Sequence, residues 1–186
     1  MGHTALLVMG MQNDFIGEGA IFPFGSMRVA RLLETVNKTI EKANRRDMEI
    51  VYIVNEYSHI DWIGNWKRNG AAQEGTEGAG LDVRIQLVND VIFSKRFNNA
   101  FSNDRLIVHL KQLRVRHIII AGVFAGTCVY RTALDAKRRG YQVTVIRDGI
   151  EDRTVKEKEE KLLQLQKNGI SVSLYEDIRW PHEKGS

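Results

Sequence analysis

Short apolar runs that suit buried strands alternate along the chain with stretches whose apolar residues repeat at helical spacing. The strand-like runs cover residues 5–9, 49–54, 91–94, 118–121, 141–146 and 170–174. Ser26 is expected to cap the first long helix, and residues 156–167 form a charged helix with Leu162, Leu163 and Leu165 inside. Regular alternation of this kind predicts right-handed β–α–β crossovers and a mostly parallel sheet with helices on both faces.

Length and composition favour a single soluble domain, and we expect residues 1–186 to form it. One cysteine excludes an intramolecular disulfide framework and a cysteine-rich zinc site. No apolar run approaches the length of a membrane span and no secretory pattern opens the chain, so the cytoplasm is the expected compartment. The net charge of +4 is mild and basic residues are scattered among acidic ones. Neither nucleic acid nor a membrane is therefore an expected partner.

Residues 56–80 break the alternation. The segment is rich in glycine and tryptophan, has no clear period and is long for an ordinary connection. Irregular segments of this length in compact domains are commonly functional loops. We expect this one to form a wall of a binding site. The last residues of the chain, 180–186, are expected to be loosely held.

The single cysteine, Cys128, lies in the segment 122–129, Gly-Val-Phe-Ala-Gly-Thr-Cys-Val. This segment follows the predicted strand 118–121 and precedes the helical stretch 130–136. A thiol at a strand-to-helix turn meets free backbone N–H groups and the positive end of a helix dipole, and both favour the nucleophilic thiolate. The alternative is a small buried hydrophobic residue, the usual role of an unpaired cysteine.

Polar residues follow two other predicted strands, in segments 10–15 and 95–101. Ligands of open α/β sheets bind at the carboxyl ends of the strands, where the strand order reverses. A lysine beside a cysteine favours the thiolate and neutralises negative charge on a substrate, which makes Lys95 a candidate site residue. The alternative for Lys95 is an ordinary surface lysine at a strand end.

Segments 5–15, 95–101 and 122–133, in this order, resemble the isochorismatase-like cysteine hydrolase family, which includes nicotinamidases and N-carbamoyl amide hydrolases. Residues 74–79 look like the pocket segment of that family, and residues 140–148 are similar to its fifth strand. The resemblance implies a single-domain, Rossmann-like three-layer α/β/α sandwich. Its six-stranded, mostly parallel sheet would have the order 3-2-1-4-5-6. The resemblance also implies a homo-oligomer.

Roles for individual residues come from the same resemblance. It implies that Cys128 is the nucleophile and Lys95 its electrostatic partner. It implies an oxyanion hole formed by the backbone N–H groups of Phe124 and Cys128, with a cis peptide bond between Val123 and Phe124. We expect Phe15, Trp62 and Glu74 to line the substrate pocket, and Trp66 is a further aromatic residue of the same loop.

The sequence departs from the family at Gly10, which stands where the family has the aspartate of its catalytic triad. Asp14 is present, but in the family motif it matches a second, usually structural acid. Glu56, after the second strand, is the nearest other carboxylate by topology. Loss of a positioned general acid typically costs about 10²–10⁴ in rate. We therefore expect weak or absent activity, and the glycine is expected to leave a small void beside the thiol.

The leading hypothesis is a cysteine hydrolase that cleaves a C–N bond of a small amide, ureido or carbamoyl compound through a thioester on Cys128. The second is a non-catalytic relative that binds a small molecule or a partner in the same cleft. A nucleotide-binding Rossmann protein is a third, disfavoured because residues 10–15 lack the glycine-rich fingerprint. His59 is the single histidine near the second strand, so neither a metal nor another cofactor is expected.

Overall fold

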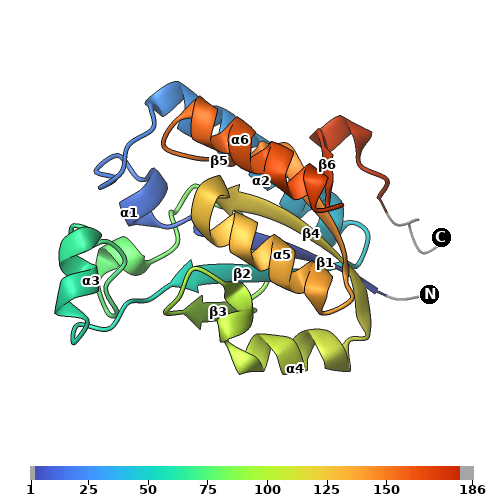
Figure 1. Cartoon of the computed structure of the whole chain (residues 1–186), viewed down its shortest axis with the longest axis horizontal. Coiled ribbons are helices and arrows are strands. Elements are labelled where there is room, and N and C mark those ends of the chain that lie inside the picture. Colours follow the sequence, from blue (N-terminus) through green and yellow to red (C-terminus); the bar gives the residue numbers. More distant parts are fainter. Residues whose placement is uncertain (1–2, 181–186) are drawn as a thin grey trace.

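The computed structural model describes residues 3–180, which form a six-stranded, all-parallel sheet between two layers of helices (Figure 1). The strand order is β3-β2-β1-β4-β5-β6, which confirms the predicted topology. The strands are β1 (His3–Met9), β2 (Glu49–Asn55), β3 (Ile92–Lys95), β4 (Val115–Val123), β5 (Gln142–Glu151) and β6 (Ser171–Ser173). Their carboxyl ends all point toward the edge of the molecule that carries α1 (Asn13–Ile16) and α3 (Trp62–Lys67).

Each face of the sheet is covered by its own hydrophobic core. On one face, α2 (Ser26–Asn44) packs against alternate β1 residues such as Leu6 and Val8. On the other face, Leu7 contributes to the core that α4 (Asp104–Gln112), α5 (Tyr130–Arg138) and α6 (Val155–Lys167) cover. Short helical turns complete the chain: η1 (Glu77–Ala79), η2 (Ala100–Ser102), η3 (Ala125–Val129) and η4 (Tyr175–Asp177). Because both faces are buried, the strands read as nearly continuous apolar runs.

Two details of the predicted helices are wrong. Ser26 is the first residue of α2 and does not cap it; the cap position is Gly25, which has a φ of 96° and no side chain to offer. In α6, Leu162 and Leu165 are buried, whereas Leu163 is 52% exposed. With 3.6 residues per helical turn, Leu162 and Leu165 lie on one face of the helix and Leu163 lies on another, which faces solvent.

The strands also differ from their predicted bounds. Strand β5 extends to Glu151 because it resumes pairing with β4 after an irregularity, with Gly122 opposite Ile150. Strand β3 is shifted by one residue and ends on Lys95. The irregular segment 56–80 contains α3, which the sequence did not predict and which the Asp61 carboxylate caps by accepting a hydrogen bond from Gly64 N–H at 3.0 Å.

At the carboxyl end of the chain, Trp180 packs against Tyr175 with ring centroids 5.8 Å apart, so this residue is not loosely held as predicted. The rest of that predicted tail, 181–186, lies outside the described residues. Between residues 3 and 180, no helix combines the length and the apolar character that crossing a bilayer requires.

Gly10 ends β1 in a conformation that suits glycine. Its φ is +64°, in the left-handed region, and its carbonyl accepts a hydrogen bond from Gln12 N–H at 2.8 Å, which closes a tight turn. A Cβ atom at this position would lie 2.5 Å from the carbonyl oxygen of Val123. The void expected beside Gly10 is therefore absent in the direction of a side chain, because the backbone of Val123 fills it.

The backbone at Gly10 predicts a stability difference between two Gly→Ala variants. Gly75 also has a positive φ (+79°), but a Cβ atom there would meet no atom within 4 Å. Gly75→Ala should lower the free energy of unfolding by about 1 kcal/mol through backbone strain alone. Gly10→Ala adds a steric clash and should cost at least about 2 kcal/mol more. Urea denaturation of both variants measures the difference, and equal losses would contradict the close approach of Val123.

Candidate active site

Two neighbouring strands and the turn after β4 bring three polar side chains together. Asn55 and Lys95 are the last residues of β2 and β3 and lie opposite each other in the register of these strands. Cys128 lies in η3, the single π-helical turn that follows β4. Each of the three is only 3% exposed. The sheet thus buries an amine, an amide and a thiol at its carboxyl edge, where parallel sheets place ligand sites.

The predicted pair of Cys128 and Lys95 is in direct contact. Lys95 Nζ donates to Cys128 Sγ at 3.0 Å, to the backbone carbonyl of Phe97 at 3.2 Å and to Asn55 Oδ1. The two oxygen acceptors are neutral amide groups. A buried ammonium is costly unless it is paired with an opposite charge. Among the described contacts of Lys95, the sulfur is the one group that can carry a negative charge.

Asn55 was missed by the sequence analysis, although it lies at the centre of the cluster. Its backbone N–H donates to Gln12 Oε1 at 2.7 Å, and Gln12 Nε2 donates back to the Asn55 carbonyl at 2.8 Å. This fixed backbone aims the amide side chain at Lys95, with Nδ2 3.9 Å from Cys128 Sγ. The available signal was a polar residue at the last position of an otherwise apolar strand.

A second amide and a phenol complete the surroundings of the sulfur. Asn98 Oδ1 lies 3.9 Å from Cys128 Sγ and accepts a hydrogen bond from the Tyr57 hydroxyl at 3.4 Å. Burial raises the pKa of Tyr57 well above its ordinary value, and the charge of Cys128 raises it further. Tyr57 therefore stays protonated at neutral pH and acts as a hydrogen-bond donor.

The turn that carries Cys128 begins at a cis peptide bond between Val123 and Phe124, the position that the family resemblance implies. The Phe124 carbonyl accepts hydrogen bonds from the N–H groups of Thr127 and Val129, both at 3.2 Å. The Phe124 N–H donates no hydrogen bond to another of the residues 3–180. It remains available as a donor to a bound oxygen, as the predicted oxyanion hole requires.

Asp152 is a buried carboxylate beside the same turn that sequence reasoning also missed. It follows β5 directly and is 6% exposed. Its carboxylate accepts hydrogen bonds from the N–H of Gly126 and, at 2.8 Å, from the N–H of Arg153. Asp152 therefore holds the turn in place, while its negative charge offsets part of the positive helix end that favours a thiolate.

No carboxylate of the described chain contacts Cys128 Sγ or Lys95 Nζ through a hydrogen bond or an ion pair. Asp14 instead accepts a hydrogen bond from Ala72 N–H at 2.7 Å and ties α1 to the irregular segment, a structural role. Glu56 reaches Lys95 only through its backbone N–H, which donates to the Lys95 carbonyl at 3.0 Å. The side chain that points from the end of β2 into the cluster belongs to Asn55.

The three residues predicted to line a pocket lie in different surroundings. Phe15 is buried and packs edge-on against Phe124, with ring centroids 5.4 Å apart. Trp62 lies on α3 and is 75% exposed. Glu74 is exposed and forms an ion pair with Arg96 at 3.4 Å. The structure therefore brings Phe15 to the cysteine turn, while Trp62 and Glu74 face solvent.

His59 does not fit the role of a metal ligand. Its Nδ1 lies 3.1 Å from Gln73 Oε1 and its Nε2 lies 2.6 Å from the Glu74 carbonyl, so both ring nitrogens are already engaged. Throughout residues 3–180, no three or more histidine, cysteine, aspartate or glutamate side chains are grouped as a metal site would need.

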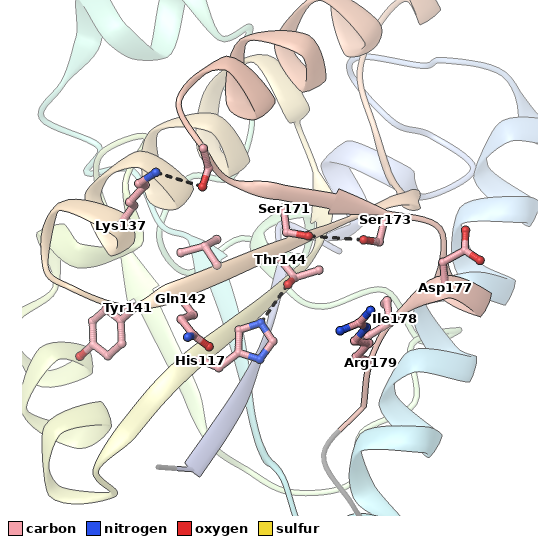
Figure 2. A pocket seen from close by; sticks show the side chains of 12 residues that line it. His117, Lys137, Tyr141, Gln142, Thr144, Ser171, Ser173, Asp177, Ile178 and Arg179 are labelled. Atoms are coloured by element: carbon pink, nitrogen blue, oxygen red, sulfur yellow. Dashed lines mark hydrogen bonds between the residues drawn. The ribbon is translucent and has the colours of Figure 1, made fainter. Parts of the chain in front are cut away.

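Two hollows lie close to the cluster. One of about 270 Å³ opens beside the cysteine turn, and its lining includes Phe124, Thr127, Asp152 and Arg153. Another of about 410 Å³ lies beside Lys95 and Phe97. A third hollow, of about 530 Å³, lies at the opposite, amino ends of β4, β5 and β6 (Figure 2).

This third hollow has no cysteine in its lining, which includes Lys137, Ser171 and Ser173. His117 points toward Thr144 within it, with Nε2 2.9 Å from the Thr144 hydroxyl oxygen, and Arg179 approaches from the other side (Figure 2). Burial lowers the pKa of His117 below its ordinary value, so the imidazole is neutral at pH 7. The chemistry of the fold is therefore concentrated at the carboxyl ends, around Cys128.

Comparisons with known proteins identify the family of the whole chain. The chain is 29% identical over 181 residues to a protein of Arabidopsis thaliana named a probable inactive nicotinamidase, and 91% of each chain is covered. An isochorismatase-like hydrolase from Alkaliphilus metalliredigens superimposes with a TM-score of 0.82 at 25% identity, covering 94% of this chain and 95% of that one. A zinc complex of pyrazinamidase from Pyrococcus horikoshii gives a TM-score of 0.79 at 26% identity, with coverage of 92% and 99%. The isochorismatase domain model matches residues 4–177, and the chain therefore belongs to the isochorismatase family.

Proposed function

We propose that this chain is a cysteine-dependent C–N hydrolase in which Cys128 forms a thioester with the acyl group of a small amide, ureido or carbamoyl compound. Its turnover is weak or absent because no carboxylate stands at position 10. The contact of 3.0 Å between Lys95 Nζ and Cys128 Sγ carries this proposal, since it supplies a charge-paired nucleophile. The amidase names of the relatives support the class of substrate.

The proposed reaction separates into two demands on the site. In the first, the Cys128 sulfur attacks the substrate carbonyl, and the backbone N–H groups of Phe124 and Cys128 receive the developing oxyanion. In the second, the leaving nitrogen needs a proton before the C–N bond breaks. The residues present serve the first demand, whereas no carboxylic acid contacts the cluster to serve the second, and Lys95 is already engaged with the sulfur. Water then hydrolyses the thioester.

A binding protein without turnover is the second candidate function. It is favoured by the closeness of Val123 to Gly10, which leaves no room for an acidic side chain in this backbone, and by the name of the inactive relative. Such a protein would hold a small molecule or a partner in the same cleft. The two candidates differ in whether Cys128 forms a covalent bond with its ligand.

Substrates with different leaving groups test the proposal directly. A p-nitrophenyl ester has a leaving group that needs no proton, so it should acylate Cys128 readily. With the matching primary amide, this chain should react at least about a hundredfold more slowly than an active member of the family does with the same amide. The reason is that no general acid protonates the leaving nitrogen. Intact-mass measurement after rapid quenching detects the acyl group, and Cys128→Ala should show none. Calorimetric binding of the amide without any adduct, even from the ester, would instead support a binding protein.

Asn55 offers a place to restore the missing acid without a change in shape. Asn55→Asp puts a carboxylate at the atom that already contacts Lys95 Nζ, while Gln12 continues to hold the backbone. We expect amide hydrolysis to rise by at least about tenfold, below the full general-acid contribution because the new group is not at position 10. Asn98→Asp is the matched control, since its Oδ1 lies 3.9 Å from the sulfur and does not contact Lys95. An equal gain in both variants would contradict a role for the Lys95 contact.

A surface apart from the cysteine cluster concerns the assembly of the chain. Trp62 and Trp66 lie one turn apart on α3 and are 75% and 79% exposed, next to Ile60 at 88%. Exposed apolar patches of this kind mark interaction sites. As part of the same proposal, a second copy of the chain covers this patch in a homo-oligomer. In this proposal the segment at α3 serves as the interface between copies.

Light scattering tests the assembly. The native chain should give a mass well above the 21.2 kDa of one copy, and the double variant Trp62→Ser, Trp66→Ser should approach that mass. Val83→Ser is the control, because Val83 is 93% exposed but lies outside the patch, and it should leave the mass unchanged. A native mass of one copy at micromolar concentration would rule out the proposed assembly.

A further inference from the structure

The buried contact between Cys128 and Lys95 joins two nucleophiles rather than a nucleophile and an acid. Sγ and Nζ are 3.0 Å apart, and both residues are only 3% exposed. The other groups in contact with Nζ are amide oxygens. Their hydrogen bonds leave the contact between Nζ and Sγ in place. The chain has no second cysteine, so an oxidised Cys128 cannot form an intramolecular disulfide.

We propose that Cys128 and Lys95 form a covalent sulfur–nitrogen bond, a sulfenamide, when a peroxide oxidises the thiol. In the first step the thiolate takes an OH group from hydrogen peroxide, and the hydroxide released takes a proton from Lys95, which gives a sulfenic acid, water and a neutral amine. In the second step this amine attacks Sγ, the S–O bond breaks, and the OH group leaves as a second water with one amine proton. No further oxidant is needed. The linked protein has lost two hydrogens in total.

The fold favours this outcome over further oxidation. Intramolecular partners held in contact react with effective concentrations of about 10⁵–10⁸ M, so the amine competes strongly with a second peroxide. Lys95 and Phe97 line a hollow of about 410 Å³, so the end of β3 that carries the amine borders open space. Asn55 is anchored by Gln12 and holds Nζ against the sulfur while the bond forms.

The bond would act as a reversible switch on the site. It consumes the nucleophile and the cation in one step and ties the end of β3 to the turn after β4. Two equivalents of an external thiol reverse it: the thiols become a disulfide and return the free cysteine and amine. The bond itself requires only the two atoms in contact. Its effect as a switch rests on the proposed function.

Peptide mapping tests the bond without any measurement of turnover. The folded chain is treated with hydrogen peroxide, blocked with an alkylating agent and digested with trypsin. A sulfenamide should prevent cleavage after Lys95 and join residues 85–96 to residues 117–131, two hydrogens lighter than the separate peptides together. Dithiothreitol added before digestion should remove the link. Mapping the peptides also separates oxidation of Cys128 from oxidation of the five methionines.

The same chain unfolded in urea is the main control, because it keeps both residues but separates them. Its linked fraction should be at least about tenfold lower, with oxygen added to Cys128 instead. Lys95→Arg should likewise give only oxygenated cysteine. The proposal is overturned if the folded native chain gains oxygen at Cys128 without linked peptides. It is also overturned if Cys128 stays unmodified at peroxide concentrations that oxidise the unfolded chain.

Discussion

The buried contact between an ammonium and a sulfur is the interaction on which the rest of this site depends. Lys95 is 3% exposed, and a charge taken from water to such a position is stabilised only by a partner and by hydrogen bonds. The sheet provides both, because the ends of β3 and β2 place the amine beside the Asn55 amide and η3 delivers the thiol. The order β3-β2-β1-β4 makes this meeting possible, with Gly10 contributing no side chain between Asn55 and the cysteine turn.

The glycine at position 10 affects the backbone of the site as well as its side chains. In this backbone the Val123 carbonyl approaches to 2.5 Å of the place that a Cβ atom would take, and the φ of +64° suits glycine. The absence of an acidic side chain at position 10 therefore goes together with close packing of Gly10 against the backbone at the end of β4. An aspartate at position 10 would require this backbone contact to widen. The chemistry of the site is consequently tied to the packing of the sheet and cannot be judged from one side chain.

The sequence predicted the topology well because apolar runs, helical periods and the family motifs all point to the same parallel sheet. It also identified Cys128 and Lys95, since residues at the carboxyl ends of neighbouring strands converge. It did not identify Asn55 or Asp152, whose importance lies in contacts across the sheet: Asn55 with Lys95, and Asp152 with the N–H of Gly126. Such contacts depend on strand register, and the carboxyl ends of β2 and β3 each lie one residue beyond their predicted positions.

The opposing charges around the cysteine turn explain why capture and release of an acyl group are separable here. Asp152 contacts the turn through the N–H of Gly126, whereas Lys95 Nζ lies 3.0 Å from Cys128 Sγ. Coulomb interactions fall with distance, so the group in direct contact with Sγ has the larger effect on it. In the proposed mechanism, protonation of a leaving nitrogen depends on a different strand end, that of β1, where Gly10 offers no side chain. The two steps of the proposed reaction therefore rely on different strand ends.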